Sequence, residues 1–286
     1  MSKDTKGFLF GVMAALCYAL MLFFAKLGKQ VPNEIMVFIR NLAFLLFTLT
    51  LTFQSKFTFK TKKIGLHIIR ATFGLLAIYC FFYVVRHLSL IESNLFFNTV
   101  PLFIPLVLLL WLKKKIPLLR LISLIIGFVG ILFVLNPAFT SFHMSMIIGI
   151  LGGIFTAIAH VSVRRLSKTE STVLIMFYFA LIATTISMFP ALFYLKDFFQ
   201  LGFLWVYILL AALFSFLFQA FITKAYSLSA VSKVSSTIYF TVAFGALLDW
   251  VGWGRIPNLS SIIGTVLIVG GGLCVIFLDK KNKIIS

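Results

Sequence analysis

The stretch HIIRATFGLLAIYCFFYVVRHLSLIESNLFFNTVPLFIPLVLLLWL, residues 67–112, decides the fold. It holds two long apolar runs, residues 67–86 and 90–112, with only a short connection between them. A helix needs roughly 20 apolar residues to cross the hydrocarbon core of a bilayer. Both runs reach this length, so the stretch predicts two consecutive membrane-spanning helices.

Eight further apolar runs of similar length follow along the chain. They cover residues 7–27, 34–53, 118–136, 145–165, 173–194, 204–226, 230–252 and 261–278. Of the 286 residues, 62% are hydrophobic and 11% are charged, which is not the composition of a soluble domain. The sequence therefore predicts an all-α membrane protein with ten transmembrane helices.

The Lys and Arg residues between these runs alternate between crowded and sparse connections. With the N-terminus placed in the cytoplasm, 18 of the 25 lie on cytoplasmic segments, five on external segments, and Arg40 and Arg70 within spans. Cytoplasmic loops of membrane proteins carry an excess of basic residues. We therefore expect a protein of the inner membrane with both termini in the cytoplasm. Basic loops beside anionic headgroups also account for the net charge of +18. We therefore expect the basic residues to contact the lipid bilayer and not a nucleic acid.

The second half of the chain repeats features of the first half. The matched boundary positions are rich in Gly, Pro and Ser, not only in aliphatic residues. At a shift of 140 the pairs are Leu88-Ser89 with Leu228-Ser229 and Ile116-Pro117 with Ile256-Pro257, and at a shift of 142 they are Gly7, Gly11 and Ala15 with Gly149, Gly153 and Ala157. Chance alignment of two Leu-, Ile- and Phe-rich halves is the alternative to a true duplication.

A duplication would divide the chain into residues 1–140 and 141–286, each with five spans. Because five is odd, the second repeat must enter the membrane in the opposite orientation to the first. Inverted repeats of this kind place a substrate site near the bilayer midplane, and rocking about that site alternates its access. The predicted architecture is therefore two inverted five-helix repeats.

Several segments of the chain resemble the drug/metabolite transporter superfamily, in its ten-helix EamA-type branch. They are Arg40 early in the second span, residues 67–103, and the motifs Lys115-Ile116-Pro117 and Arg255-Ile256-Pro257. The resemblance implies a carrier of small metabolites such as amino acids, their derivatives and nucleoside-like compounds. The third and fourth spans are most similar to the S-adenosylmethionine carriers of intracellular bacteria. The family's usual Gly-Glu pair after the fourth and ninth spans is replaced by Lys114-Lys115 and Gly254-Arg255, so the role of that acid does not carry over.

Polar residues inside the spans indicate which helix faces could line a cavity, because such groups are costly in lipid. In the fourth span Asn94, Asn98, Pro101 and Pro105 share one face. That face suits a cavity wall, although both amides could instead form hydrogen bonds to neighbouring helices. In the third span Tyr79 and Tyr83 could stack on a planar or cationic ligand, or simply pack among the 35 Phe residues.

The second half contributes its own candidates for substrate binding. They are His160 on the sixth span, Gln219 on the eighth, and Ser236 and Tyr239 on the ninth. His160 could bind substrate or relay a proton, or be a buried neutral histidine. The Gly149, Gly153 and Thr156 face that precedes it favours close helix packing.

The charged residues inside the spans suggest specific roles. Arg40 could anchor a carboxylate or phosphate of the substrate, or pair with Glu92 near the outer end of the fourth span. Glu92 and Asp249 are the acids placed to bind a coupling proton or a substrate amine. Arg70 is near the inner face, and we expect its head group to extend to the lipid headgroups.

No catalytic, metal-binding or nucleotide-binding motif is present, so an enzyme is not expected and no cofactor is implied. The sequence favours a secondary transporter, whether uniporter, symporter or exchanger, that moves a small polar metabolite by alternating access. An amino-acid-like compound or S-adenosylmethionine is the favoured substrate. A flippase for a lipid-linked intermediate is the alternative function. A homodimer is compatible with the sequence.

Overall fold

The computed structural model describes residues 3–54, 59–88, 96–113, 144–194, 201–229, 236–254 and 262–267 as its longer continuous segments, with shorter stretches and single residues between and beyond them. All regular elements in this part of the chain are helical. Six are long and apolar enough to cross a membrane. They are α1 (Lys3–Leu27), α2 (Asn33–Gln54), α3 (Ile64–His87), α7 (Met144–Leu166), α8 (Thr172–Ala191, continued by η1, Leu192–Tyr194) and α10 (Leu204–Leu228).

Two shorter apolar helices match the fourth and ninth predicted spans: α5 (Val100–Leu112) and α12 (Phe240–Trp253), the latter preceded by the 3-10 turn η2 (Ser236–Tyr239). The all-α class is thus confirmed. Most of the fifth and tenth predicted spans, residues 118–136 and 261–278, lies outside the described residues, so the count of ten and the repeat architecture stay predictions.

The fourth span is interrupted within its described part. Phe96–Asn98 is helical, Thr99 forms a turn, and α5 then begins at Val100. Pro101 lies in the first turn of α5, where a missing N–H costs little, and Pro105 lies in its interior. Both prolines of this span therefore follow a break in the helix.

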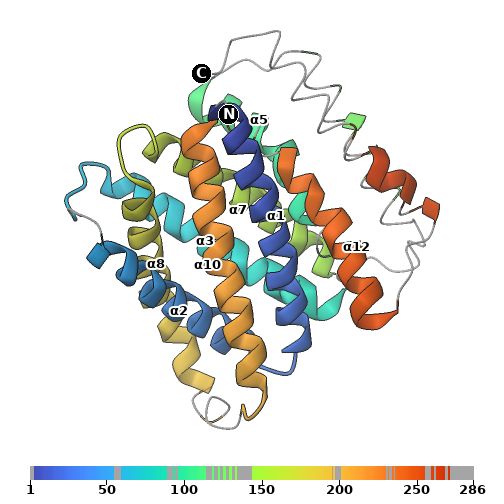
Figure 1. Ribbon diagram of the computed structural model, residues 1–286, viewed down its shortest axis with the longest axis horizontal. Coiled ribbons are helices and arrows are strands. Elements are labelled where there is room, and N and C mark those ends of the chain that lie inside the picture. The colour runs from blue at the N-terminus through green and yellow to red at the C-terminus, as the bar shows by residue number, and fades with distance from the viewer. Residues whose placement is uncertain are drawn as a thin grey trace.

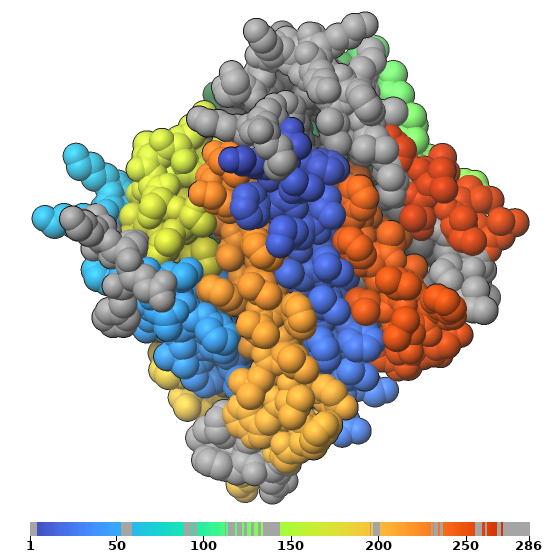
Figure 2. All heavy atoms as spheres, viewed as in Figure 1, coloured from blue at the N-terminus to red at the C-terminus, as the bar shows by residue number. Residues whose placement is uncertain are grey.

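The long helices pack as neighbours that are distant in sequence. α1 lies against α10, α3 against α7, and α2 against α8, with further contacts of α2 with α10 and of α3 with α8. α5 packs on α7, and α12 packs on α1. Figure 1 shows α1 and α10 side by side at the centre, with α12 on one flank and α2 and α8 on the other. Figure 2 shows the contact between α1 and α10 running along the same face.

Contacts at the helix ends establish the direction of the first helix of each half. Gly7, near the start of α1, lies against Ser229, which directly follows the end of α10. Arg164, near the end of α7, donates from Nη1 to the carbonyl oxygen of Tyr226 at the same end of α10, at 2.7 Å. The start of α1 and the end of α7 therefore share one side of the molecule, and these two helices run in opposite directions.

Two glycines allow α1 and α7 to approach neighbouring segments closely. A Cβ atom on Gly11 of α1 would overlap the side chain of Thr237, and one on Gly153 of α7 would overlap Thr99. Small residues at helix contacts are typical of membrane proteins, where close packing replaces the hydrophobic effect. The packing interpretation of the Gly149–Gly153 face is supported by these contacts.

The outer surface of the bundle is strongly apolar. Leu110 is 81% exposed, Phe193 88% and Val251 72%. Exposed apolar side chains on this scale suit contact with acyl chains and not with water.

Candidate functional site

A cavity lies inside the bundle where α1, α2, α3, α7 and α10 meet the segment before α5. Its polar lining includes Arg40, Arg70, His160 and Gln219, and its aromatic lining includes Tyr18, Phe81, Phe97 and Phe218. The space available to the centres of water molecules is about 40 Å³, which is room for about three waters. Small-molecule pockets usually measure about 300–1,000 Å³, so this cavity is smaller than a typical ligand pocket.

Arg40 is positioned by α2 and is almost completely buried, with 1% of its surface exposed. Its Nη1 donates to Oδ1 of the adjacent Asn41 at 2.7 Å, while its Nε has no partner among the described residues. Asn41 in turn donates to Ser187 Oγ of α8 at 3.2 Å. Arg40 thus carries a buried charge whose described contacts are with a neutral amide. Glu92, its predicted partner, lies outside the described residues.

Arg70 of α3 is only 3% exposed, which corrects the expectation that its head group reaches the lipid headgroups. Its Nη2 donates to Oε1 of Gln219 on α10 at 2.8 Å, and its guanidinium carbon lies 4.0 Å from the ring centroid of Phe179. The amide and the ring satisfy part of the guanidinium. Its Nε has no partner in the part of the chain that the structure describes.

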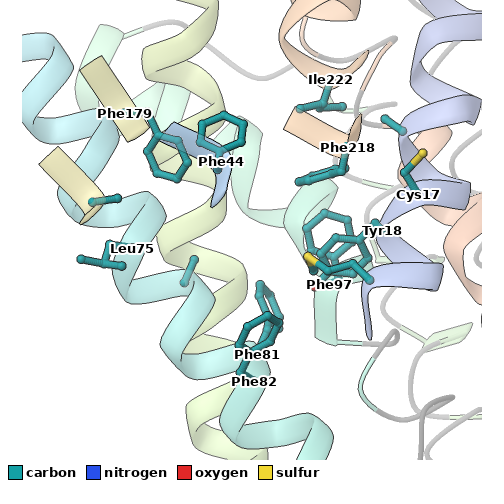
Figure 3. Close-up of a cluster of buried hydrophobic side chains, with 14 of the residues drawn as sticks. Cys17, Tyr18, Phe44, Leu75, Phe81, Phe82, Phe97, Phe179, Phe218 and Ile222 are labelled. Atoms are coloured by element: carbon teal, nitrogen blue, oxygen red, sulfur yellow. The ribbon is translucent and has the colours of Figure 1, made fainter. Parts of the chain in front are cut away.

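Four aromatic rings form a continuous wall beside these arginines. Tyr18 of α1 stacks on Phe97 with ring centroids 3.6 Å apart, and both contact Phe218 and Phe81. Figure 3 shows Tyr18, Phe97 and Phe218 gathered between the helices, with Phe81 below them. The Tyr18 hydroxyl has no hydrogen-bond partner among the described residues. The wall therefore offers both a stacking surface and an available hydroxyl.

His160 completes the polar side of the cavity from α7. Its Nδ1 lies 2.8 Å from the hydroxyl oxygen of Tyr226 on α10, so the two side chains share a hydrogen bond. This bond satisfies one ring nitrogen and orients the imidazole. His160 can either bind a ligand or hold a proton through its other nitrogen.

The other predicted site residues whose side chains the structure describes do not line the cavity. Asn98 donates to Thr241 Oγ1 at 2.9 Å, and Tyr83 stacks on His87 with ring centroids 4.2 Å apart. Tyr79 and Tyr239 also lie away from the cavity lining. Glu92 and Asn94 lie outside the described residues, and Ser236 belongs to η2 with its side chain outside them. Arg40, His160 and Gln219 are the predicted residues that the structure brings together.

Sequence reasoning did not single out Tyr18, although a signal for it was available. At the shift of 142 that pairs Gly7 with Gly149, Tyr18 falls on His160. Both side chains line the same cavity from opposite halves of the chain. No comparable sequence signal distinguishes Phe81, Phe97 and Phe218 from the other phenylalanines, of which the chain has 35 in all.

A second polar cluster lies at the side of the bundle where α3 begins. His67 of α3 pairs through Nε2 with the carboxylate of Glu170, which lies in the turn between α7 and α8, and the Thr61 hydroxyl donates to the same carboxylate. The Tyr178 ring is tilted against the His67 ring, with the centroids 4.5 Å apart, and its hydroxyl donates to the Phe59 carbonyl oxygen at 2.8 Å. The cluster ties the segment before α3 to the second half of the chain.

Replacing Glu170 by alanine removes the acceptor that Thr61 and His67 share. Losing hydrogen bonds at a carboxylate costs about 1.5–3 kcal/mol. We expect the purified variant to unfold several degrees below the wild type in a thermal scan in detergent. A Thr169→Ala variant of the neighbouring turn residue serves as the control, and equal melting temperatures for both variants would contradict the role of the cluster.

Comparison with known proteins identifies the family. The model of the EamA-like transporter family matches the chain twice, over residues 5–136 and 143–277. This chain belongs to the EamA-like transporter family. It is thus a multi-pass membrane protein, as the apolar helices indicate, and the family resemblance drawn from its sequence is confirmed.

Individual members of the EamA-like family differ in what they carry. The chain is 28% identical to the pseudopaline exporter of Pseudomonas aeruginosa, over 97% of each chain. It is 23% identical to the S-adenosylmethionine uptake transporter of Rickettsia bellii, over 80% of this chain and 78% of that one. It is also 23% identical to the riboflavin transporter of Brucella anthropi, over 88% of this chain and 91% of that one. A solved crystal structure shares the fold, with a TM-score of 0.71 and 16% identity over 97% of this chain and 98% of the other.

Proposed function

We propose that this chain is a secondary transporter that moves a small polar metabolite across a bacterial inner membrane by alternating access. An amino-acid-like compound or S-adenosylmethionine is the leading substrate class. Membership of a transporter family supports the general function. The observation that carries the proposal is the cavity, where Arg40, Arg70, His160 and Gln219 come from four different helices and meet inside an apolar bundle.

The proposed mechanism needs two inverted five-helix units, residues 1–140 and 141–286. The double match of the family model supports a duplication. The helix contacts also support it when α1 is exchanged with α7, α2 with α8, α3 with α10 and α5 with α12. The contact α1–α10 then becomes α7–α3, α2–α10 becomes α8–α3, α1–α12 becomes α7–α5, and α2–α8 maps onto itself. The opposite directions of α1 and α7 support the inversion.

The helix ends follow the same exchange. α3 ends at the extended residue Leu88, whose N–H donates to the Val84 carbonyl, and α10 ends in the same way at Ser229. α5 ends at Lys113 with a φ of 52°, and α12 ends at Gly254 with a φ of 65°. A positive φ is unusual for lysine, so its match with a glycine at the equivalent end supports a shared backbone design.

A cavity of this small size fits one intermediate of such a cycle. A metabolite is larger than three water molecules, so binding requires the surrounding helices to separate. In inverted-repeat carriers, one unit rocks against the other around a fixed site. With both termini in the cytoplasm, the His67–Glu170 cluster would then close the cytoplasmic side.

Uptake of labelled metabolites by cells that express the chain tests this function. The panel contains S-adenosylmethionine, neutral and acidic amino acids, and riboflavin, and export from preloaded membrane vesicles is measured alongside. We expect accumulation or efflux of at least one compound well above that of an Arg40→Ala variant present at equal membrane level. Equal rates for the two proteins across the whole panel, in both directions, would contradict the proposal.

A further inference from the structure

The cavity concentrates positive charge without a described acid to balance it. Arg40 and Arg70 both line it, and each is at least 97% buried. In the described part of the chain, the cavity lining contains no Asp or Glu. Asp249, the buried described acid, belongs to α12 and is not part of the lining. Among the described residues, therefore, no acid of the lining balances the two guanidinium groups that face the cavity.

Each of these arginines also retains unused hydrogen-bond donors. A guanidinium carries five N–H donors in a planar fork. The described bonds use Nη1 of Arg40 and Nη2 of Arg70, and the Nε of both side chains has no partner among the described residues. An unpaired buried charge is costly, and a carboxylate or phosphate bound through two parallel bonds offsets that cost.

The number of charges limits the kind of substrate. Two guanidinium groups in one apolar enclosure repel each other, and a single carboxylate would leave one of them unbalanced. A substrate with two negative groups can balance both. S-adenosylmethionine carries a sulfonium and an ammonium beside its one carboxylate, so it would add positive charge to a site that already has an excess.

The aromatic wall receives the rest of the substrate. Tyr18 and Phe97 form a stacked pair next to the arginines, and the Tyr18 hydroxyl, which has no partner among the described residues, can bond a polar group of the ligand. A planar or apolar substituent would thus be buried on one side of the cavity while the anionic groups occupy the other.

We infer that the transported metabolite is a small dianion, in the first place one with two carboxylates, which Arg40 and Arg70 bind together. This inference rests on the proposed transport function and specifies its substrate class. It ranks dicarboxylated amino-acid derivatives above S-adenosylmethionine.

Thermal unfolding of the purified full chain in detergent, at constant ionic strength, tests the inference without a known substrate. The dianionic probes are succinate and 2-oxoglutarate, and the matched controls are butyrate and S-adenosylmethionine. We expect the dianions to raise the melting temperature of the wild type and the controls to leave it unchanged. Equal shifts with butyrate, or a shift with S-adenosylmethionine alone, would overturn the inference. Glycerol 3-phosphate distinguishes recognition of a phosphate from recognition of carboxylates. A higher melting temperature with glycerol 3-phosphate, and none with succinate, would overturn the preference for carboxylates.

Three variants locate the effect. Arg40→Gln and Arg70→Gln should each abolish the shift with succinate, whereas Arg165→Gln, whose guanidinium lies over Trp111 outside the cavity, should keep it. Without ligand, both cavity variants should melt above the wild type, because they remove an unbalanced buried charge. A lower melting temperature together with a retained succinate shift would contradict the assignment, and misfolding alone cannot produce that combination.

Glu92→Gln tests whether the acid predicted from the sequence already balances Arg40. We expect succinate to raise the melting temperature of this variant by the same amount as that of the wild type, within twofold. A shift several times larger would show that Glu92 competes for Arg40, and would overturn the claim of an unbalanced pair. If some panel compound is transported and yet no dianion shifts the melting temperature, the transport function stands and the dianion inference fails.

Discussion

Replacing Arg70 by glutamine is expected to lower transport by about ten- to a hundred-fold while the protein still reaches the membrane. A hydrogen bond to a charged group contributes about 1.5–3 kcal/mol, which corresponds to this range in affinity or rate. The variant also frees the Gln219 amide, which accepts from Arg70 in the wild type. Initial uptake rates at equal membrane protein level, measured for the compound identified in the panel, give the comparison.

Arg165→Gln provides the matched control for this prediction, because it removes an equally basic side chain from α7 outside the cavity lining. Its uptake rate should remain within twofold of the wild type. If Arg70→Gln and Arg165→Gln transport equally well, Arg70 has only a structural role and the cavity is not the binding site.

The second large effect is expected at Gly11 of α1. A valine there would place its Cβ within the volume of the Thr237 side chain, so that α1 and η2 must move apart. Overpacking of this kind costs about 1–3 kcal/mol and also disturbs a contact on which the helix arrangement depends. We expect Gly11→Val to lower the yield of folded, monodisperse protein in size-exclusion chromatography several-fold.

Gly65 offers the control for that substitution. It lies in the first turn of α3, is exposed, and an added Cβ atom there would meet no other atom within 4 Å. Gly65→Val should therefore leave the elution profile unchanged. Equal losses for both variants would indicate a general effect of replacing helical glycines and not the α1–η2 contact.

The helical architecture was largely predictable because the length of an apolar run is set by the bilayer. The run predicted over residues 34–53 corresponds to α2 at Asn33–Gln54, and that over 204–226 corresponds to α10 at Leu204–Leu228. The break in the helix at Thr99 was harder to predict from the sequence, because it depends on the prolines and on the packing of Thr99 against Gly153.

The site was predictable where polarity stood out from an apolar background, as at Arg40, His160 and Gln219. Arg70 was misjudged because its span was taken to begin at His67, which placed the arginine close to the membrane surface. α3 begins three residues earlier, at Ile64, so Arg70 lies about 9 Å along the helix from its start. Asn98, by contrast, has the polarity of a site residue but bonds to Thr241 instead.

Alternating access is the central claim, and the reactivity of a cysteine in the cavity tests it most directly. Ala159 lines the cavity, so an Ala159→Cys variant in a background without Cys17, Cys80 and Cys274 carries a single thiol there. A membrane-impermeant thiol reagent is applied to right-side-out and to inside-out vesicles, with Gly65→Cys as a thiol expected to react from the cytoplasmic side alone. Our account predicts that the cavity thiol reacts from both sides and that a transported compound slows both reactions. Reaction from one side only, unaffected by that compound, would contradict it.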